Sequence, residues 1–114
     1  MRQPTFFDKD TSARGGDAER IVLYALGDFQ ARGKALAGRD LPLDRLRGAL
    51  RRAADALGAD ELGDEQAAAA LSALGAGVRR VPAFVAKHPF RVVVPDALAA
   101  RARDYLKQLR QPEG

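Results

Sequence analysis

Apolar residues recur three and four positions apart along several stretches of the chain. Residues 18–32 show this spacing most clearly, which predicts an amphipathic helix with a wide buried stripe. A second helix is expected from Pro42 or Leu43 to Leu57, where Gly58 provides a C-terminal stop. A short third helix over residues 65–74 follows Asp64 as its cap, and a last helix follows Pro95-Asp96.

Between the third and last helices the pattern changes from helical to strand-like. Residues 78–85 and 90–94 are rich in β-branched and aromatic side chains, and residues 86–89 form the intervening turn of a predicted β-hairpin. Pro82 and Pro89 lack the backbone donor of a strand ladder, so the strands are short or lie at an edge. The pattern predicts an α+β fold, mainly α, with three helices, a β-hairpin and a C-terminal helix.

The chain of 114 residues fits one domain. Pro4 and the pair Gly15-Gly16 disfavour regular structure, so residues 1–16 are expected to be a flexible arm ahead of a globular domain over 17–110 and a tail over 111–114. The adjacent Phe6 and Phe7 either fold back onto the domain or dock on a second subunit.

The expected core follows from the apolar faces of these elements. Gly48, inside the second predicted helix, costs stability there and is expected to let a neighbouring helix approach closely. The predicted core comprises Ile21, Val22, Leu26, Phe29, Leu46, Leu50, Leu57, Leu71, Leu74, Val81, Val92, Val94, Leu98, Tyr105 and Leu109.

Composition narrows the chemistry. The chain has no cysteine, which excludes disulfides, thiolate catalysis, iron–sulfur clusters and cysteine zinc sites. Its one histidine, His88, lies in the predicted turn, and a catalytic triad or histidine metal site needs more partners. The sequence therefore predicts a non-enzymatic protein with no cofactor and no metal.

Two further features bear on sites and location. The carboxylates of Asp60, Glu61, Asp64 and Glu65 are close in sequence, but their spacing does not match a calcium loop, and they suit the N-terminal end of the third helix. No run of residues is apolar enough for a membrane span, and residues 1–10 do not match a signal peptide. We expect a cytoplasmic protein without membrane contact.

The formal charge of +4 is distributed in blocks. Residues 32–52 hold seven basic and two acidic side chains, residues 53–78 hold five acidic and no basic ones, and residues 79–110 hold eight basic and two acidic ones. Such blocks either attract an anionic partner or pair with one another inside the fold. One of Arg79 and Arg80 is expected to pair with an acid from 60–65.

The element order over residues 18–110 resembles that of winged helix-turn-helix domains. The resemblance places residues 64–74 at the position of a recognition helix and residues 78–94 at the wing. Recognition helices present side chains such as Arg, Asn and Gln to bases. This helix begins with two acids that would face phosphates, so base reading in the major groove is not expected.

Two functions remain open on the sequence. The first is association with nucleic acid through backbone phosphates, which would give salt-sensitive binding. The second is a protein-interaction or assembly module. Convergence of the basic residues on one face favours the first, and their dispersal favours the second. The candidate phosphate contacts are Arg45, Arg47, Arg51 and Arg52 on the second helix and Arg79, Arg80, Lys87 and Arg91 on the hairpin.

The last helix has an apolar stripe with no later segment to cover it. Leu98, Tyr105, Leu106 and Leu109 form this stripe. It either packs back on the first helix or forms the seam of a homodimer.

Overall fold

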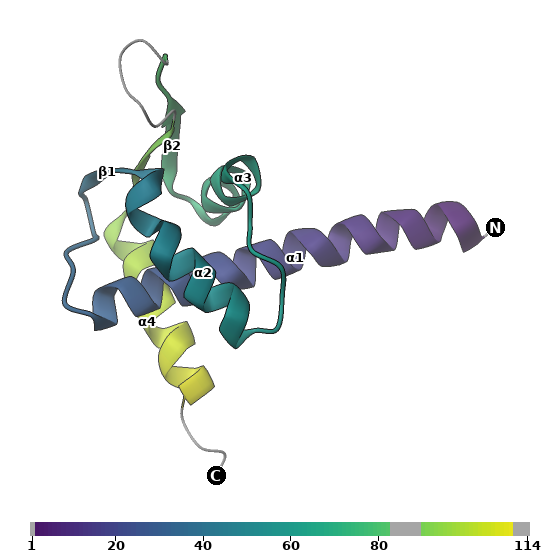
Figure 1. Cartoon of the computed structure of the whole chain (residues 1–114), viewed down its shortest axis with the longest axis horizontal. Coiled ribbons are helices and arrows are strands. Elements are labelled where there is room, and N and C mark those ends of the chain that lie inside the picture. The colour runs from purple at the N-terminus through teal and green to yellow at the C-terminus, as the bar shows by residue number, and fades with distance from the viewer. Residues whose placement is uncertain (1, 83–89, 111–114) are drawn as a thin grey trace.

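The computed structural model describes residues 2–82 and 90–110, and over residues 2–16 it describes the backbone alone. This part of the chain is α+β and mainly helical, with four α-helices and a three-stranded antiparallel sheet (Figure 1). Within it, no helix is long and apolar enough to cross a membrane. The elements are α1 (Arg2–Ala31), β1 (Asp40–Pro42), the 3-10 helix η1 (Leu43–Leu46), α2 (Arg47–Ala56), α3 (Asp64–Leu74), β2 (Gly77–Arg80), β3 (Phe90–Val93) and α4 (Asp96–Arg110).

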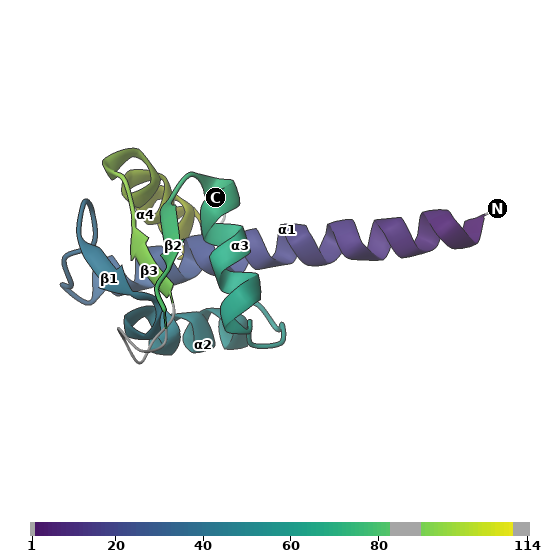
Figure 2. The same ribbon diagram turned by 90° about the horizontal axis from the view of Figure 1, so that it is seen from above.

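Helix α1 begins at Arg2, so the helix start expected near residue 18 is wrong. Its N-terminal half extends away from the other elements in both views (Figures 1 and 2). Pro4 lies in the first turn, where its missing N–H has no partner to lose, and Gly15-Gly16 weaken a helix without removing hydrogen bonds. That residues 1–16 move as a flexible arm stays a prediction.

The C-terminal half of α1 is the centre of the core. It packs against α2, α3 and α4, with α2 and α4 on opposite sides of it (Figure 2). Ten of the predicted core residues are buried, and Leu57, Leu74, Val81 and Tyr105 are partly buried. Leu109 is 48% exposed, so its assignment to the core is wrong: it lies in the last turn of α4. The confirmed core residues are Ile21, Val22, Leu26, Phe29, Leu46, Leu50, Leu71, Val92, Val94 and Leu98.

The predicted pairing of the two hairpin strands is confirmed, but β2 ends at Arg80 and is shorter than the strand predicted over 78–85, and a third strand joins the pair. β2 pairs antiparallel with β3, and β1 pairs with the other edge of β3, giving the order β1-β3-β2. No strand was expected at β1, because three residues ending in proline carry too short a pattern to predict one. The turn expected over 86–89 lies outside the described residues.

Helix α2 begins at Arg47, about one turn after its predicted start at Pro42 or Leu43, and α3 begins at Asp64, one residue before its predicted start. The chain enters α2 through the single 3-10 turn η1. Gly63, rather than Asp64, is the N-cap of α3, and the side chain of Gln66 accepts the Gly63 N–H at 2.9 Å. Gly75 ends α3 with a φ of 108°, a conformation that favours glycine.

The close helix–helix approach occurs at Gly27 on α1, not at Gly48. A Cβ at Gly27 would lie 2.7 Å from the carbonyl oxygen of Ala102 and 2.9 Å from the Cβ of Leu106. Gly48 is exposed, and the nearest atom to a Cβ there belongs to Arg52 of the same helix. Gly27 therefore sets how closely α1 and α4 pack.

Candidate functional site

Two of the hairpin arginines share one carboxylate on β1. The register places Arg79 of β2 directly opposite Arg91 of β3, which would be repulsive without a counter-ion. Asp40 supplies it: Oδ2 lies 2.7 Å from Arg79 Nη2, and Oδ1 lies 3.2 Å from Arg91 Nε. Arg91 also donates to the Asp40 carbonyl oxygen at 3.2 Å. The unpredicted strand β1 thus offsets one of the two positive charges in the part of the hairpin expected to meet phosphates.

Arg80 is held on the other side of the hairpin. Its Nη2 donates to Glu65 Oε2 at 2.8 Å, which confirms the expected pairing between this arginine pair and the 60–65 acids. Its guanidinium also lies over the ring of Phe90, 4.6 Å from the centroid, in cation–π geometry.

The acidic segment pairs with α2. Arg47 contacts Asp64 and lies 3.8 Å from Glu61, while Arg51 lies 3.6 Å from Glu61. The first turn of α3 is thereby tied to α2 by ion pairs. Over residues 17–82 and 90–110, whose side chains the structure describes, no group of three or more metal-ligating side chains is assembled.

Three candidate phosphate contacts remain: Arg45, Lys87 and Arg52, and Arg52 pairs with Asp28 as described below. Arg45 is exposed on η1 and has no ion-pair partner in the described part of the chain. Lys87, like His88, lies outside the described residues. Of the seven predicted contacts that lie in the described part of the chain, six face a carboxylate, so these residues do not form one unpaired basic face.

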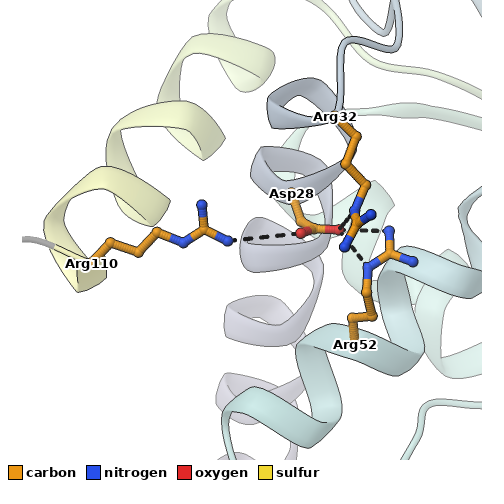
Figure 3. A network of polar contacts seen from close by, with 4 residues as sticks. All are labelled: Asp28, Arg32, Arg52 and Arg110. Carbon is orange, nitrogen blue, oxygen red and sulfur yellow. Dashed lines mark hydrogen bonds and ion pairs between the residues drawn. The ribbon is translucent and has the colours of Figure 1, made fainter.

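Asp28 on α1 is a buried carboxylate that sequence reasoning missed. Its side chain is 6% exposed, and three arginines surround it, two from helices α2 and α4 and one from the turn that follows α1 (Figure 3). Arg52 of α2 donates Nε and Nη2 to Oδ2 at 2.8 and 2.6 Å, and Arg32, just past α1, donates Nε to the same oxygen at 3.2 Å. Arg110 of α4 lies 3.9 Å from Oδ1. We call Asp28, Arg32, Arg52 and Arg110 the Asp28 cluster.

The Asp28 cluster carries an excess of positive charge. Three guanidinium groups face one carboxylate, which leaves two positive charges uncompensated within the cluster. The arginine side chains are 51%, 41% and 55% exposed for Arg32, Arg52 and Arg110, so this charge is presented to solvent. The i,i+4 spacing of Asp28 and Arg32 was visible in the sequence, whereas the approach of Arg52 and Arg110 depends on the packing of α2 and α4.

A groove adjoins the Asp28 cluster between α1 and α4. Its volume is about 420 Å³, which lies within the range of ligand pockets. The floor is apolar because Gly27 and Ala31 of α1 face Leu106 of α4. We call this feature the α1–α4 groove; it is lined by Gly27, Gln30, Ala31, Arg103, Leu106, Lys107 and Arg110.

Gln30 fixes one wall of the α1–α4 groove. Its Nε2 donates to the carbonyl oxygens of Leu26 at 3.1 Å and Ala99 at 2.9 Å, so it joins the backbones of α1 and α4. Its Oε1 accepts a hydrogen bond from Arg103 Nη1 at 2.8 Å. The groove thus combines an apolar floor with three cationic side chains, and no acid is among its lining residues.

A larger hollow of about 590 Å³ has the opposite character. It lies between α1 and the α2–α3 connection, and Asp17, Asp60 and Glu61 are among its lining residues. Asp17 pairs with Arg20 at 2.5 Å, and Glu61 faces α2 arginines. The cationic groove and this acidic hollow give the domain two surfaces of opposite sign.

The predicted seam residues of α4 divide between the core and the surface. Leu98 and Leu106 are buried within the domain, where α4 packs against α1. Tyr105 is half-buried and Leu109 exposed. Leu98 and Leu106 are therefore not free for a dimer seam, which leaves Tyr105 and Leu109 of the predicted stripe, and the seam itself stays a prediction.

Comparison with known proteins finds no matching family model and no similar curated protein or solved structure.

Proposed function

We propose that this protein is a non-enzymatic protein-interaction module whose α1–α4 groove binds an acidic amphipathic helix of a partner protein. The observation that carries the proposal is the chemistry of the groove: an apolar floor at Gly27, Ala31 and Leu106 beneath Arg103, Lys107 and Arg110. Helix-in-groove recognition uses such a floor for apolar anchors.

Charge complementarity selects the polarity of the partner. Arg103, Lys107 and Arg110 follow one another at i, i+4 and i+7, so they line one edge of α4 along the groove. A partner helix whose acidic residues flank its apolar stripe places carboxylates beside these cations. Such pairing raises the association rate and fixes the orientation of the complex more than it adds affinity.

The ion pairs of α2 and of the β2–β3 hairpin argue against phosphate binding by the arginines predicted for it. Arg47, Arg51, Arg79, Arg80 and Arg91 each face a carboxylate of this chain. These carboxylates offset the positive charge of the arginines, which reduces the electrostatic gain that drives non-specific binding.

We also propose that the chain has a winged-helix-like scaffold. Helices α2 and α3 and the β2–β3 hairpin follow in the expected order, with β1 as an added strand. At the recognition-helix position, Asp64 and Glu65 open α3 and pair with Arg47 and Arg80. We therefore propose that such a scaffold serves protein binding at the α1–α4 groove rather than base reading by α3.

The test is fluorescence anisotropy with three labelled probes: an acidic amphipathic helical peptide, the same peptide with its acids replaced by lysine, and duplex DNA. We expect the acidic peptide to bind most tightly at moderate salt. Lys107→Glu is expected to weaken that binding about tenfold, which corresponds to about 1.4 kcal/mol. Arg101→Glu is the matched control, because Arg101 is exposed on α4 and does not line the groove.

Two outcomes would contradict the proposal. Tighter binding of duplex DNA than of the acidic peptide, with a steep salt dependence, would favour the nucleic-acid function instead. Equal weakening by the two variants would mean that overall charge, and not the groove, determines the affinity.

A further inference from the structure

We infer that the Asp28 cluster is a binding site for a dianionic phosphoryl group, which Arg32 and Arg52 contact, while Arg110, on the opposite side of the Asp28 carboxylate (Figure 3), adds positive charge. This site goes beyond the proposed function, because Arg32 and Arg52 do not line the α1–α4 groove. Three features of the cluster favour a phosphoryl group: the arginine donors that Asp28 leaves free, the net positive charge, and the buried carboxylate that orients the arginines.

Asp28 engages only part of the hydrogen-bonding capacity around it. A guanidinium has five N–H donors in a fixed fork. Arg32 gives Asp28 its Nε alone, and its two Nη groups have no other partner among the described residues. Arg52 donates Nε and Nη2 to Asp28, and its Nη1 group also has no other partner among the described residues. Several charged donors therefore point away from Asp28 toward solvent.

The carboxylate also places these donors. Both Arg32 and Arg52 donate to the same Oδ2 atom, so their guanidinium groups are held side by side (Figure 3). The two guanidinium charges repel one another at this spacing. The negative charge of the Asp28 carboxylate, whose side chain is 6% exposed, offsets this repulsion. Orientation by a buried partner lowers the entropy that each arginine loses when a ligand binds.

The charge of the cluster matches a dianion. The two uncompensated positive charges are neutralised by one phosphate monoester, which carries about −1.5 to −2 near neutral pH. Its three terminal oxygens also accept bidentate hydrogen bonds from arginine forks. A phosphodiester carries a single negative charge and exposes fewer terminal oxygens, so it fits the site less well.

Solution NMR on the ¹⁵N-labelled protein tests this inference through the arginine Nε–Hε signals. The probes are inorganic phosphate at about pH 8, where it is mainly a dianion, dimethyl phosphate as a diester, and chloride at matched ionic strength. We expect saturable shifts of the Arg32 and Arg52 signals with inorganic phosphate and little response to the other two.

A variant pair checks the assignment. Arg32→Gln should weaken phosphate binding by about tenfold or more, the loss expected for a charge-assisted hydrogen bond. Arg39→Gln, the same change at an exposed position of the α1–β1 connection, should leave it unchanged. Arg52→Lys keeps the charge but removes the fork, and it should also weaken binding.

The results distinguish the inference from its alternatives. Equal shifts with chloride, or phosphate affinity unchanged in Arg32→Gln, would overturn it. If dimethyl phosphate binds as tightly as inorganic phosphate, the site accepts a diester and does not select a dianion. If inorganic phosphate binds as expected, titrations with glycerol phosphate and with a phosphoserine peptide show whether the phosphoryl group belongs to a small-molecule monoester or to a phosphorylated protein. Because these probes are compared at the Asp28 cluster, failure of peptide binding in the α1–α4 groove would leave the result intact.

Discussion

Replacing Gly27 with alanine tests the close contact between α1 and α4 that shapes the groove. In a helix interior, alanine is normally more stable than glycine by about 1 kcal/mol. At Gly27 the added Cβ would lie 2.7 Å from the Ala102 carbonyl oxygen and 2.9 Å from Leu106 Cβ. Both distances are shorter than real Cβ contacts, and the Ala102 oxygen belongs to the backbone, so α4 has to move away from α1.

The magnitude follows from two opposing terms. Overpacking a well-packed site costs about 1–3 kcal/mol, and the helix propensity of alanine offsets about 1 kcal/mol of it. We therefore expect Gly27→Ala to lower the free energy of unfolding by up to about 2 kcal/mol. Gly48→Ala is the control, because a Cβ there meets only Arg52 Nη1 at 3.5 Å; it should raise stability by about 0.5–1 kcal/mol.

The assay is urea unfolding followed by circular dichroism, with both variants compared with the parent protein. The difference between the two free energies isolates the overpacking cost, since the propensity gain is common to both. Thermal unfolding should agree, because 1 kcal/mol moves Tm by roughly 4–8 °C in a domain of about this size. Equal stabilisation by the two substitutions would show that α1 and α4 do not approach at Gly27.

Four further substitutions probe the core and the ion pairs. Leu106→Ala should cost about 2–5 kcal/mol in urea unfolding, whereas Leu109→Ala should change stability by less than about 0.5 kcal/mol; similar losses would contradict the different burial of the two side chains. Asp28→Asn should cost roughly 1.5–3 kcal/mol by the same assay, and a neutral result would mean that the cluster contributes nothing to the packing of α1 against α2. Asp40→Asn should release Arg79 and Arg91 and make the salt dependence of duplex DNA binding steeper by up to about two units, and an unchanged slope in anisotropy titrations would show that Asp40 does not mask them.

The sequence predicted elements better than it predicted their contacts. Periodicity over residues 18–32, 43–57, 65–74 and 96–110 placed helices, and the β-branched run placed the hairpin. The start of α1 was missed because proline and glycine lower helix propensity without excluding a helix. Strand β1 was missed because its pairing with β3 comes from tertiary contacts, not from its own three residues.

The candidate site could be predicted only in part. Arg52 was selected from its charge, and Arg80 was expected to pair with an acid, as it does with Glu65. Asp28 was hidden because a single acid within an apolar helix gives no spacing that points to distant arginines. Likewise, the loss of Arg79 and Arg91 as free cations depends on Asp40, whose position follows from the unpredicted strand.

The most direct test of the proposed function is to map where an acidic amphipathic peptide binds. Backbone amide shifts of the ¹⁵N-labelled protein can be followed during titration with the peptide. The account predicts that the largest saturable shifts occur at Gly27, Ala31 and Leu106, which form the floor of the α1–α4 groove. Shifts concentrated on α3 and the β2–β3 hairpin, with the groove amides unchanged, would contradict it.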